Sequence, residues 1–391
     1  MDRDFDIIVH GATGFTGRLV AEHLLKVYGA AGDLKWAMAG RNKAKLEQVR
    51  SEIGAPASLS LVIADCSDPA SLTAMTRRAK AIVTTAGPYQ LYGSDLVAAC
   101  AAQGADYVDI TGEPGWMYDM LVHEAVAKAS GARIIFCCGF DSIPFDLGVH
   151  FLEAAAQARF ALPAARVRAR VRKLERGVGG GQSGGSYATG IATMEAAQAN
   201  PQIISVLTDP FALTPGFKGP AQPDGSKAYE DTVTGSWVAP FRAAAIDTKV
   251  VHRSNFLMGH PWGKDFRYDE MSIADGPTGS GVGTPSFYMV GGNPPKPGEG
   301  PSRAEREGGC YDILFIGETA AGRILRTSVK GDMDPGAGST SRMLGESAVC
   351  LVRDIARDKT PGGIWTSASA MGDALIKRLA LNAGITFQVE L

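Results

Sequence analysis

The sequence predicts an α/β protein in which a doubly wound parallel sheet is followed by a second, α+β domain with a mixed sheet. Three observations carry this prediction. Short β-rich runs alternate with amphipathic runs through the first 137 residues, a glycine-rich turn follows the first run, and the alternation ends after residue 150. Strands that alternate with helices are typical of βαβ units, whose right-handed crossovers give a parallel sheet with helices on both faces.

Strand and helix signals alternate through the first part of the chain. The strand signals are short runs rich in β-branched and aromatic residues, at 5–10, 34–39, 59–64, 81–85, 107–110 and 133–137. The helical patterns between them lie at 16–27, 43–53, 69–78, 93–103 and 117–130. Because each of the first five strands is followed by a helix, we expect the strands to lie parallel in one domain, residues 1–145.

The change of pattern after residue 150 indicates a second domain over residues 146–337. Arg166–Lys173 alternates apolar and basic side chains, as a half-exposed antiparallel strand does. A glycine turn that continues as a helix is expected at 184–198, and further strand signals occur at 234–247 and 311–330.

An irregular loop is expected at residues 271–309, which hold 16 glycines or prolines in 39 positions. The chain then closes with helical patterns at 340–357 and 368–381 and a strand signal at 385–389. These elements make up a third segment, residues 338–391.

Composition excludes several classes of function. Lys and Arg number 39 against 41 Asp and Glu, so no basic field predicts nucleic-acid binding. No apolar run approaches the ~18 residues of a transmembrane helix, and the first residues lack the apolar stretch of a signal peptide. Six cysteines without a CxxC motif and six scattered histidines predict no metal site. We expect a reduced, cytoplasmic protein.

A glycine-rich turn gives the strongest functional signal. Gly11, Gly14 and Gly17 form a G-x-x-G-x-x-G spacing between the first strand and the first helix. The first glycine permits a tight turn, the second lets the backbone approach a pyrophosphate, and the third lets helix and strand pack closely. The helix N-terminus then binds phosphate through backbone N–H groups. This context predicts a Rossmann dinucleotide site, with a purely structural turn as the alternative.

The end of the second strand favours NADP(H) over NAD(H). An NAD site usually has an acid there for the ribose hydroxyls, but the segment MAGRNKAK has none and puts Arg41 directly after Gly40. A guanidinium suits a 2′-phosphate; the alternative is a solvated residue at a helix start. Asp65, after the third strand, either lies near the adenine or caps the helix that starts near Pro69.

Strands four, five and six end in segments that we expect to face one cleft, because ligands bind at the carboxyl ends of strands in an open α/β sheet. These segments are TTAGPY at 84–89, DITGE at 109–113 and CGFDSIP at 138–144. The expected cofactor contacts are Gly11, Thr13, Gly14, Phe15, Thr16, Gly17, Arg41, Asn42, Asp65, Cys66, Ala86, Gly87 and Pro88.

Four residues near these ends are candidate catalytic groups. The phenol of Tyr89 either donates a proton or only packs against the nicotinamide ring. Asp141 and Ser142 either orient the substrate or cap a helix before Pro144. Tyr187 ends the run GVGGGQSGGSY, a glycine turn that lacks the Lys-Ser/Thr ending of a P-loop and is expected to roof the cleft.

These segments together resemble a known family. GATGFTG, AGRN, TAGPYQLYG, YVDITGE and CCGFDSIPFDLG, followed by GSTSRMLGESAVCL and SASAMGDALIKRL, resemble the saccharopine dehydrogenase-like oxidoreductases, in particular the trans-acting enoyl reductases of bacterial lipid and polyketide synthesis. The resemblance covers most of the chain. It implies an NADP-binding Rossmann domain, a mixed-sheet second domain with a homodimer through its sheet, and C-terminal helices that return to the first domain.

The expected function is an NADPH-dependent reductase of an α,β-unsaturated acyl or carbonyl compound, an apolar small-molecule substrate. Hydride goes to the β-carbon, donors at the strand ends stabilise the charge on the carbonyl oxygen, and a positioned acid or water protonates the α-carbon. Two alternatives stay open: reduction of a ketone or imine in the same cleft, and a non-catalytic protein that binds a dinucleotide or lipid.

Overall fold

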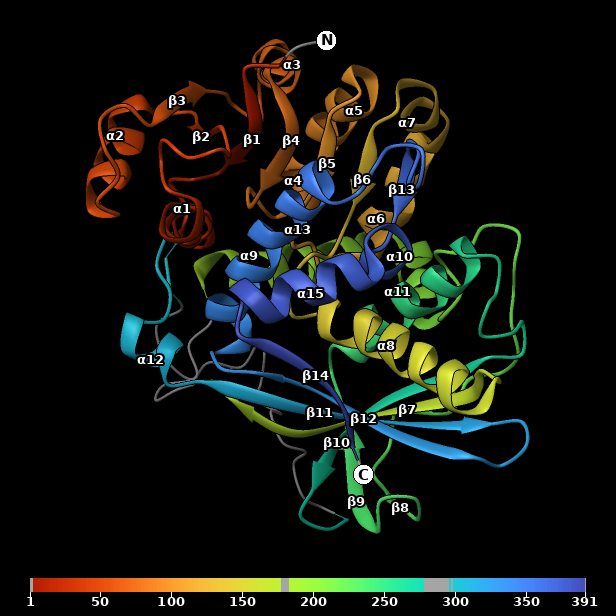
Figure 1. Cartoon of the computed structure of the whole chain (residues 1–391). Helices are drawn as coiled ribbons and strands as arrows, with labels where there is room; N and C mark the ends of the chain where they lie inside the picture. Colours follow the sequence, from red (N-terminus) through yellow and green to blue (C-terminus); the bar gives the residue numbers. More distant parts are fainter. Residues whose placement is uncertain (1–2, 177–182, 278–294, 297, 391) are drawn as a thin grey trace.

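Two seven-stranded sheets, one above the other in Figure 1, form the frame of the molecule, with helices between them. The structure is a computed structural model that describes residues 3–176, 183–277, 295–296 and 298–390. Within these ranges, no helix has the length and apolar character that crossing a bilayer demands. The predicted fold class, a doubly wound parallel sheet with a second mixed sheet, is confirmed.

The upper sheet is entirely parallel and has the order β3-β2-β1-β4-β5-β6-β13. Its strands are β1 (Phe5–His10), β2 (Trp36–Gly40), β3 (Ser60–Ile63), β4 (Ala79–Thr84), β5 (Asp106–Val108), β6 (Arg133–Ile135) and β13 (Gly363–Trp365). The first six strands keep the Rossmann order. The seventh, β13, comes from the C-terminal segment and pairs with β6, an addition that the sequence did not predict.

Helices cover both faces of the parallel sheet. Those within the first domain are α1 (Phe15–Tyr28), α2 (Lys43–Glu52), α3 (Pro69–Arg78), α4 (Tyr89–Tyr92), α5 (Ser94–Gln103), α6 (Pro114–Met120) and α7 (Glu124–Ser130). The single helix predicted at 117–130 was wrong. A 3-10 turn at Leu121–His123 divides it, and no residue of that turn is fully buried.

The lower sheet is mixed and has the order β14-β12-β11-β7-β10-β9-β8. Its strands are β7 (Ala164–Glu175), β8 (Tyr229–Asp231), β9 (Ser236–Pro240), β10 (Arg267–Ala274), β11 (Cys310–Thr319), β12 (Ile324–Gly331) and β14 (Ile385–Glu390). Central strand β7 runs parallel to β10 and antiparallel to β11. The predicted alternating strand lies in β7, but Arg170 is fully buried there because Asp231 and Asp269 pair with it.

Two predictions for the second domain were wrong. Within 234–247 only β9 is a strand; the following residues begin α11 (Ala244–Leu257), as its alanine-rich start favours. The segment expected as an irregular loop, 271–309, instead begins inside β10 and contains the short helix α12 (Arg303–Glu307) near its end. A capping box of Ser302 and Glu305 stabilises the N-terminus of this helix. Residues 278–294 and 297 of that loop lie outside the described residues.

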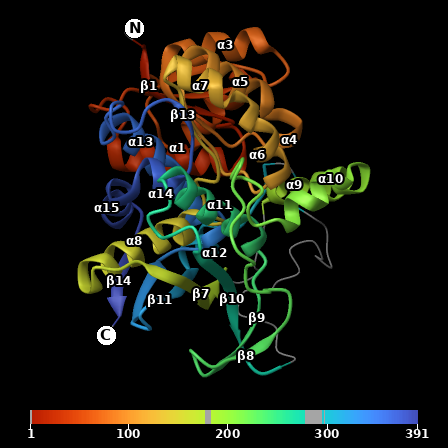
Figure 2. The same cartoon turned by 90° about the vertical axis from the view of Figure 1, so that its right-hand side faces the viewer.

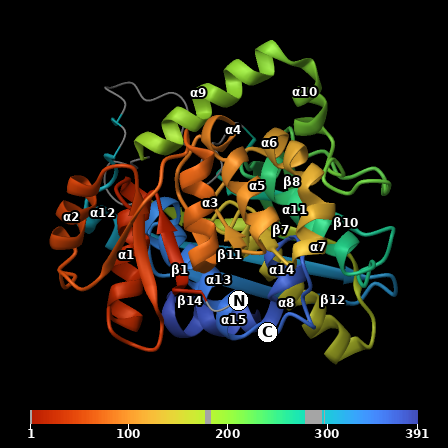
Figure 3. The ribbon, with the colours of Figure 1, turned by 90° about the horizontal axis from the view of Figure 1, so that it is seen from above.

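The remaining helices lie mainly between the sheets and along one side of the molecule. They are α8 (Ile143–Phe160), α9 (Gly184–Ala199), α10 (Pro201–Thr208), α13 (Thr340–Arg353), α14 (Ser367–Ala370) and α15 (Gly372–Asn382). The two helices α9 and α10 run along one side, beside α4 and α6 (Figures 2 and 3). Met371 separates α14 from α15, so the helix predicted at 368–381 is two helices.

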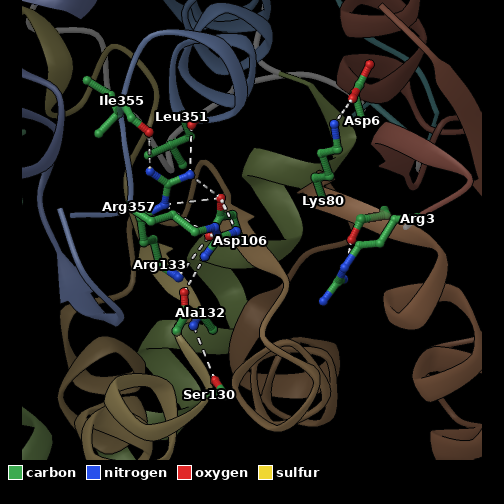
Figure 4. A network of polar contacts seen from close by, with 12 residues as sticks. Arg3, Asp6, Lys80, Asp106, Ser130, Ala132, Arg133, Leu351, Ile355 and Arg357 are labelled. Carbon is green, nitrogen blue, oxygen red and sulfur yellow. Dashed lines mark hydrogen bonds and ion pairs between the residues drawn. The ribbon is translucent and has the colours of Figure 1, made fainter. Parts of the chain in front are cut away.

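The segment after residue 338 contributes to both sheets. Its helix α13 packs against α1 and β4, whereas its two strands β13 and β14 pair with β6 and β12. A buried ion pair between Asp106 and Arg133 joins the starts of β5 and β6, and Arg133 also donates to carbonyl oxygens beside the end of α13 (Figure 4). The domain limits at 145 and 337 stay predictions.

Candidate active site

The glycine turn after β1 has the geometry of a phosphate cradle. Gly11 has a φ of +79°, and a Cβ on Gly17 would lie 2.2 Å from the carbonyl oxygen of Gly11. Gly14 is the N-cap residue of α1, and no side chain caps this helix. Only glycines therefore let the turn pass so closely, and the first N–H groups of α1 are left for an anion. These residues fit the pyrophosphate of a dinucleotide.

The other predicted residues of this turn have different surroundings. Thr16 lines the cleft described below. The methyl carbon of Thr13 lies near Gly40, at the end of β2. The ring of Phe15 is buried and packs against Gly300, with guanidinium groups above it. The Phe15 side chain thus packs against its neighbours, and only the backbone N–H of this residue remains to bind a phosphate.

Charged and polar residues follow β2 and β3. Arg41 is exposed, and its charge acts on Asp65 and Cys66, so it lies near the end of β3. The Asn42 side chain accepts a hydrogen bond from the Lys45 backbone N–H and so caps α2. Cys66 lies 4.0 Å from Nε2 of His10, a buried residue whose pKa burial lowers to about 4.

Asp65 does not cap the following helix. Its carboxylate accepts hydrogen bonds from the backbone N–H and the hydroxyl of Ser67, which hold its pKa below the ordinary value. The carboxylate of Asp68 caps α3 instead, by accepting from the Ala70 N–H. The helix-cap alternative for Asp65 was therefore wrong, and a place near the adenine stays a prediction.

The ends of β4, β5 and β6 converge on one cleft between the two sheets. The first helical residues of α9 and the turn between β9 and α11 close its other side. The cleft consists of two adjoining chambers, lined by Thr16, Thr85, Gly87, Tyr89, Ile110, Thr111, Gly112, Glu113, Cys137, Gly139, Phe140, Asp141, Arg176, Ser183, Gly185, Ser186, Thr189, Phe241, Arg242, Ala243, Ile246, Gly336, Ala337 and Thr340. Its wall is thus aromatic and aliphatic, with a few charged and hydroxyl groups.

Tyr89 lines this cleft, but backbone groups engage its hydroxyl. That hydroxyl donates to the carbonyl oxygen of Thr84 over 3.0 Å and accepts from the Ile110 N–H over 3.3 Å. The ring stacks near Trp116, with 5.5 Å between centroids, and burial raises the pKa of the phenol. This arrangement supports the packing alternative; proton donation by Tyr89 stays a prediction.

Glu113, at the end of the DITGE segment, holds the turn after β4. Its two carboxylate oxygens accept hydrogen bonds from the backbone N–H groups of Tyr89 and Gln90, each over 2.8 Å. Burial raises the pKa of Glu113, and these two hydrogen bonds oppose that rise. The segment was predicted to face the cleft, but this carboxylate was not predicted as a site residue.

Asp109 joins the ends of β5 and β6. One carboxylate oxygen accepts from the N–H groups of Thr111 and Cys137, at 3.1 and 2.9 Å, and the other from the Tyr107 hydroxyl at 2.8 Å. Burial raises its pKa to about 7, and the hydrogen bonds oppose that rise. Cys137 has a φ of +59°, a conformation that non-glycine residues rarely adopt. Asp109 thereby fixes a strained turn in the cleft wall.

Asp141 is a half-buried carboxyl group that lines the cleft. Burial raises its pKa, while Arg176 and Arg242 lower it. The next residue, Ser142, is buried, and its hydroxyl has no hydrogen-bond partner among the described residues. Ser142 occupies the N-cap position of α8, as the capping alternative predicted. Its hydroxyl, however, makes no capping hydrogen bond to the helix.

The glycine run before α9 lies partly outside the described residues, which omit 177–182. Its described end reaches the cleft through Ser183, Gly185 and Ser186, as the predicted roof would. Tyr187 lies on the same helix but is not among the cleft-lining residues, so the structure does not bring it together with Tyr89 and Asp141.

Sequence reasoning missed Arg176, Arg242, Phe241 and Ile246. Arg176 follows β7, directly before the glycine run, whereas the other three lie around the β9–α11 turn, far from any motif that was recognised. They reach the strand ends of the upper sheet only because the lower sheet packs there. No local sequence pattern predicts that proximity. Within the described residues, no group of three or more His, Cys, Asp or Glu side chains could hold a metal ion.

Comparisons with known proteins agree with this geometry. Residues 7–135 match the family described as the saccharopine dehydrogenase NADP binding domain. A Mycobacterium tuberculosis protein that carries a provisional name, trans-acting enoyl reductase, is 39% identical over 99% of this chain and 97% of its own length. The trans-acting enoyl reductase of Mycobacterium ulcerans is 36% identical over 96% of both chains.

A solved structure shares the fold. The apo, histidine-tagged saccharopine dehydrogenase (L-Glu forming) of Saccharomyces cerevisiae is similar over 99% of this chain and 100% of that chain, with a TM-score of 0.51. The identity is 13%, so this likeness speaks for the fold alone.

Proposed function

This chain belongs to the saccharopine dehydrogenase-like family of NADP-dependent oxidoreductases, and from that premise we propose that it reduces the C=C bond of an α,β-unsaturated acyl compound with NADPH. One observation carries the proposal. A cleft with mainly apolar walls opens at the strand ends next to the phosphate cradle, and it is lined by the carboxyl group of Asp141. Relatives named trans-acting enoyl reductase support the choice of an acyl C=C bond.

The cofactor site is built by this chain's own backbone and one cation. The N-terminus of α1 holds the pyrophosphate, and Arg41 holds the 2′-phosphate. The turn at Ala86–Pro88, with the ends of β5 and β6, orients the nicotinamide toward the cleft. Bound NADPH supplies a hydride, with its electron pair, for the β-carbon of the substrate.

The cleft walls orient the substrate and exclude water. Phe140, Phe241 and Ile246 contact its apolar part. The hydroxyl of Ser186 and the guanidinium of Arg242 donate to the carbonyl oxygen, where negative charge develops.

We place the proton donor at Asp141. It lines the cleft, and burial favours its protonated form. Its carboxyl proton goes to the α-carbon and leaves a carboxylate between two arginines, whose positive charge stabilises that product state. Tyr89 is the second candidate, but its hydroxyl proton already serves the Thr84 carbonyl.

A turnover assay tests the proposal. NADPH oxidation is followed with a panel of enoyl thioesters, free enones, ketones and imines. We expect turnover with the enoyl compounds, and Asp141→Asn to lose about 10²–10⁴-fold in kcat. Turnover of ketones or imines alone would make the protein a carbonyl or imine reductase. NADPH binding without turnover of any compound would support the non-catalytic alternative.

A role in lipid metabolism, a cytoplasmic location and a homodimer through the lower sheet complete the proposal. The dimer follows from the family resemblance and is tested by sedimentation, in which a clean monomer at working concentration would contradict it.

A further inference from the structure

Two carboxyl groups lie buried together behind the cleft wall. Asp247, in the first turn of α11, is 0% exposed, and Glu270, on β10, is 2% exposed. The helix packs on this strand. None of the four carboxyl oxygens has a hydrogen-bond partner in good geometry among the described residues, and no ion pair reaches them there.

The chemistry of the pair favours one shared proton. As two carboxylates, the groups have no donor between them and repel each other in a medium of low polarity. As one acid and one carboxylate, they hydrogen-bond to each other, and that contact raises the pKa of Asp247. Burial raises the pKa of Glu270 to about 8, although hydrogen bonding with Tyr268 and Asp247 opposes that rise. The shared proton therefore persists at neutral pH.

The pair adjoins the cleft. Ile246, which directly precedes Asp247, lines the cleft, as do Arg242 and Ala243 just before α11. The charge of Asp141 acts on both members of the pair.

Several acidic groups act on the pair. They are Tyr268 and Asp269 on β10, Asp141 in the loop before α8, and Asp146 on α8 itself. Asp269 is neutralised on the other face of the strand by Arg166 and Arg170. The cations Arg176 and Arg242 act on Asp141. Among the described residues, no cation offsets the negative charge of the pair. A bound proton therefore offsets it.

We propose that Asp247 and Glu270 form a proton reservoir that recharges Asp141 after each turnover. The inference rests on the proposed function of Asp141 as proton donor. In each cycle the O–H bond of Asp141 breaks as its proton joins the α-carbon. An O–H bond of the pair then breaks, the proton forms a new O–H bond on Asp141, and solvent returns one proton to the pair. The two residues are positioning residues, because they act through Asp141.

Asp247→Asn tests the reservoir directly. The amide matches the carboxyl group in shape and donates a hydrogen bond to Glu270, but it carries no acidic proton. A purely structural pair would be preserved by this change. A reservoir would be lost: we expect kcat to fall about tenfold or more with KM and NADPH affinity unchanged. Small buffer acids such as imidazolium should restore the rate in proportion to their concentration, as they replace the internal donor.

Glu153→Gln provides the matched control. Glu153 is a buried carboxyl group of α8 whose pKa burial also raises to about 8, but it accepts from the Ala164 N–H and lies outside the cleft. We expect its kcat to stay within about twofold of the wild type, with no buffer dependence. Wild-type kcat and buffer independence in Asp247→Asn would overturn the proposal.

A second measurement separates this proposal from the proposed function. Infrared titration of the cofactor-free protein should show a protonated carboxyl group above pH 7 that is absent from both Asp247→Asn and Glu270→Gln. If no panel substrate turns over, the proposed function fails, and the reservoir fails with it. The infrared band would then show only whether the shared proton exists. If substrates turn over and this band is missing, the reservoir alone is overturned.

Discussion

The guanidinium of Arg133 pairs with the carboxylate of Asp106 and also donates to the last carbonyl oxygens around α13, those of Leu351 and Ile355, at 2.7 and 2.8 Å. Both side chains are almost fully buried, and Figure 4 shows their contacts. The end of a helix leaves carbonyl groups without partners, and a cation is favourable there. One residue thus joins β5, β6 and the C-terminal segment.

Replacing Arg133 should destabilise the whole protein. Arg133→Met leaves the Asp106 carboxylate buried, with the half-exposed Arg357 as its remaining ion-pair partner among the described residues. Removal of one partner of a buried pair typically costs about 3–5 kcal/mol of unfolding free energy. Arg357→Ala is the control and should cost under about 1 kcal/mol, since solvent screens that pair. Urea unfolding measures both, and equal losses would contradict the prediction.

A chain truncated after residue 335 should aggregate. It loses β13 and β14 together with α13 and α15, whose fully buried Met343, Leu344 and Leu375 pack on the rest of the protein, so the apolar surface under these helices becomes exposed. Exposed patches of this kind drive association. Solubility and light scattering of the truncated chain check this, and a soluble truncated chain that still binds NADPH would show that the first domain stands alone.

The upper sheet could be predicted because its information is local. Six strands and their helices alternate in sequence order, and Gly11, Gly14 and Gly17 mark the turn between β1 and α1. The rest depends on contacts between distant segments. β13 pairs with β6 across more than two hundred residues, and Arg242 reaches the cleft only because the lower sheet folds beneath it. The hydrogen bonds of the Tyr89 hydroxyl could not be predicted for a similar reason, since its partners are backbone groups that no side-chain pattern reveals.

Arg41→Ala should weaken NADPH binding and spare NADH. Arg41 is the exposed residue directly after β2, where no acid is present to bind ribose hydroxyls. A charge-assisted hydrogen bond contributes about 1.5–3 kcal/mol, so we expect about a 10- to 150-fold rise in the Kd of NADPH. Calorimetry with both cofactors measures this. Equal losses for NADPH and NADH would show that Arg41 acts through folding rather than through the 2′-phosphate.

The pKa of Asp109 predicts a pH-dependent stability. Burial raises that pKa to about 7 in the folded protein, above the ordinary 3.8. The folded state therefore holds a proton that the unfolded state has released, and this residue's contribution to stability falls as pH rises from about 4 to 7. Asp109→Asn keeps the oxygen that accepts from Thr111 and Cys137, so it should fold. Its unfolding free energy should fall less steeply over that range, by up to roughly 1.4 kcal/mol per pKa unit. Parallel curves for variant and wild type would contradict the raised pKa.

Tyr89→Phe tests whether the Tyr89 phenol is the proton donor or only stabilises the cleft wall. The substitution keeps the ring against Trp116 and removes only the hydroxyl, so the Thr84 carbonyl and the Ile110 N–H lose their partner. Buried backbone groups without a partner cost about 1–3 kcal/mol, and we expect the variant to lose that much stability. Its kcat with the best enoyl substrate should fall less than about tenfold, because the proton comes from elsewhere. A general acid would cost about 10²–10⁴-fold instead. Asp141→Asn, measured beside it, should show the opposite pattern: a large loss in kcat with little loss of stability. A loss of more than a hundredfold in the kcat of Tyr89→Phe, with Asp141→Asn nearly as active as the wild type, would identify Tyr89 as the proton donor.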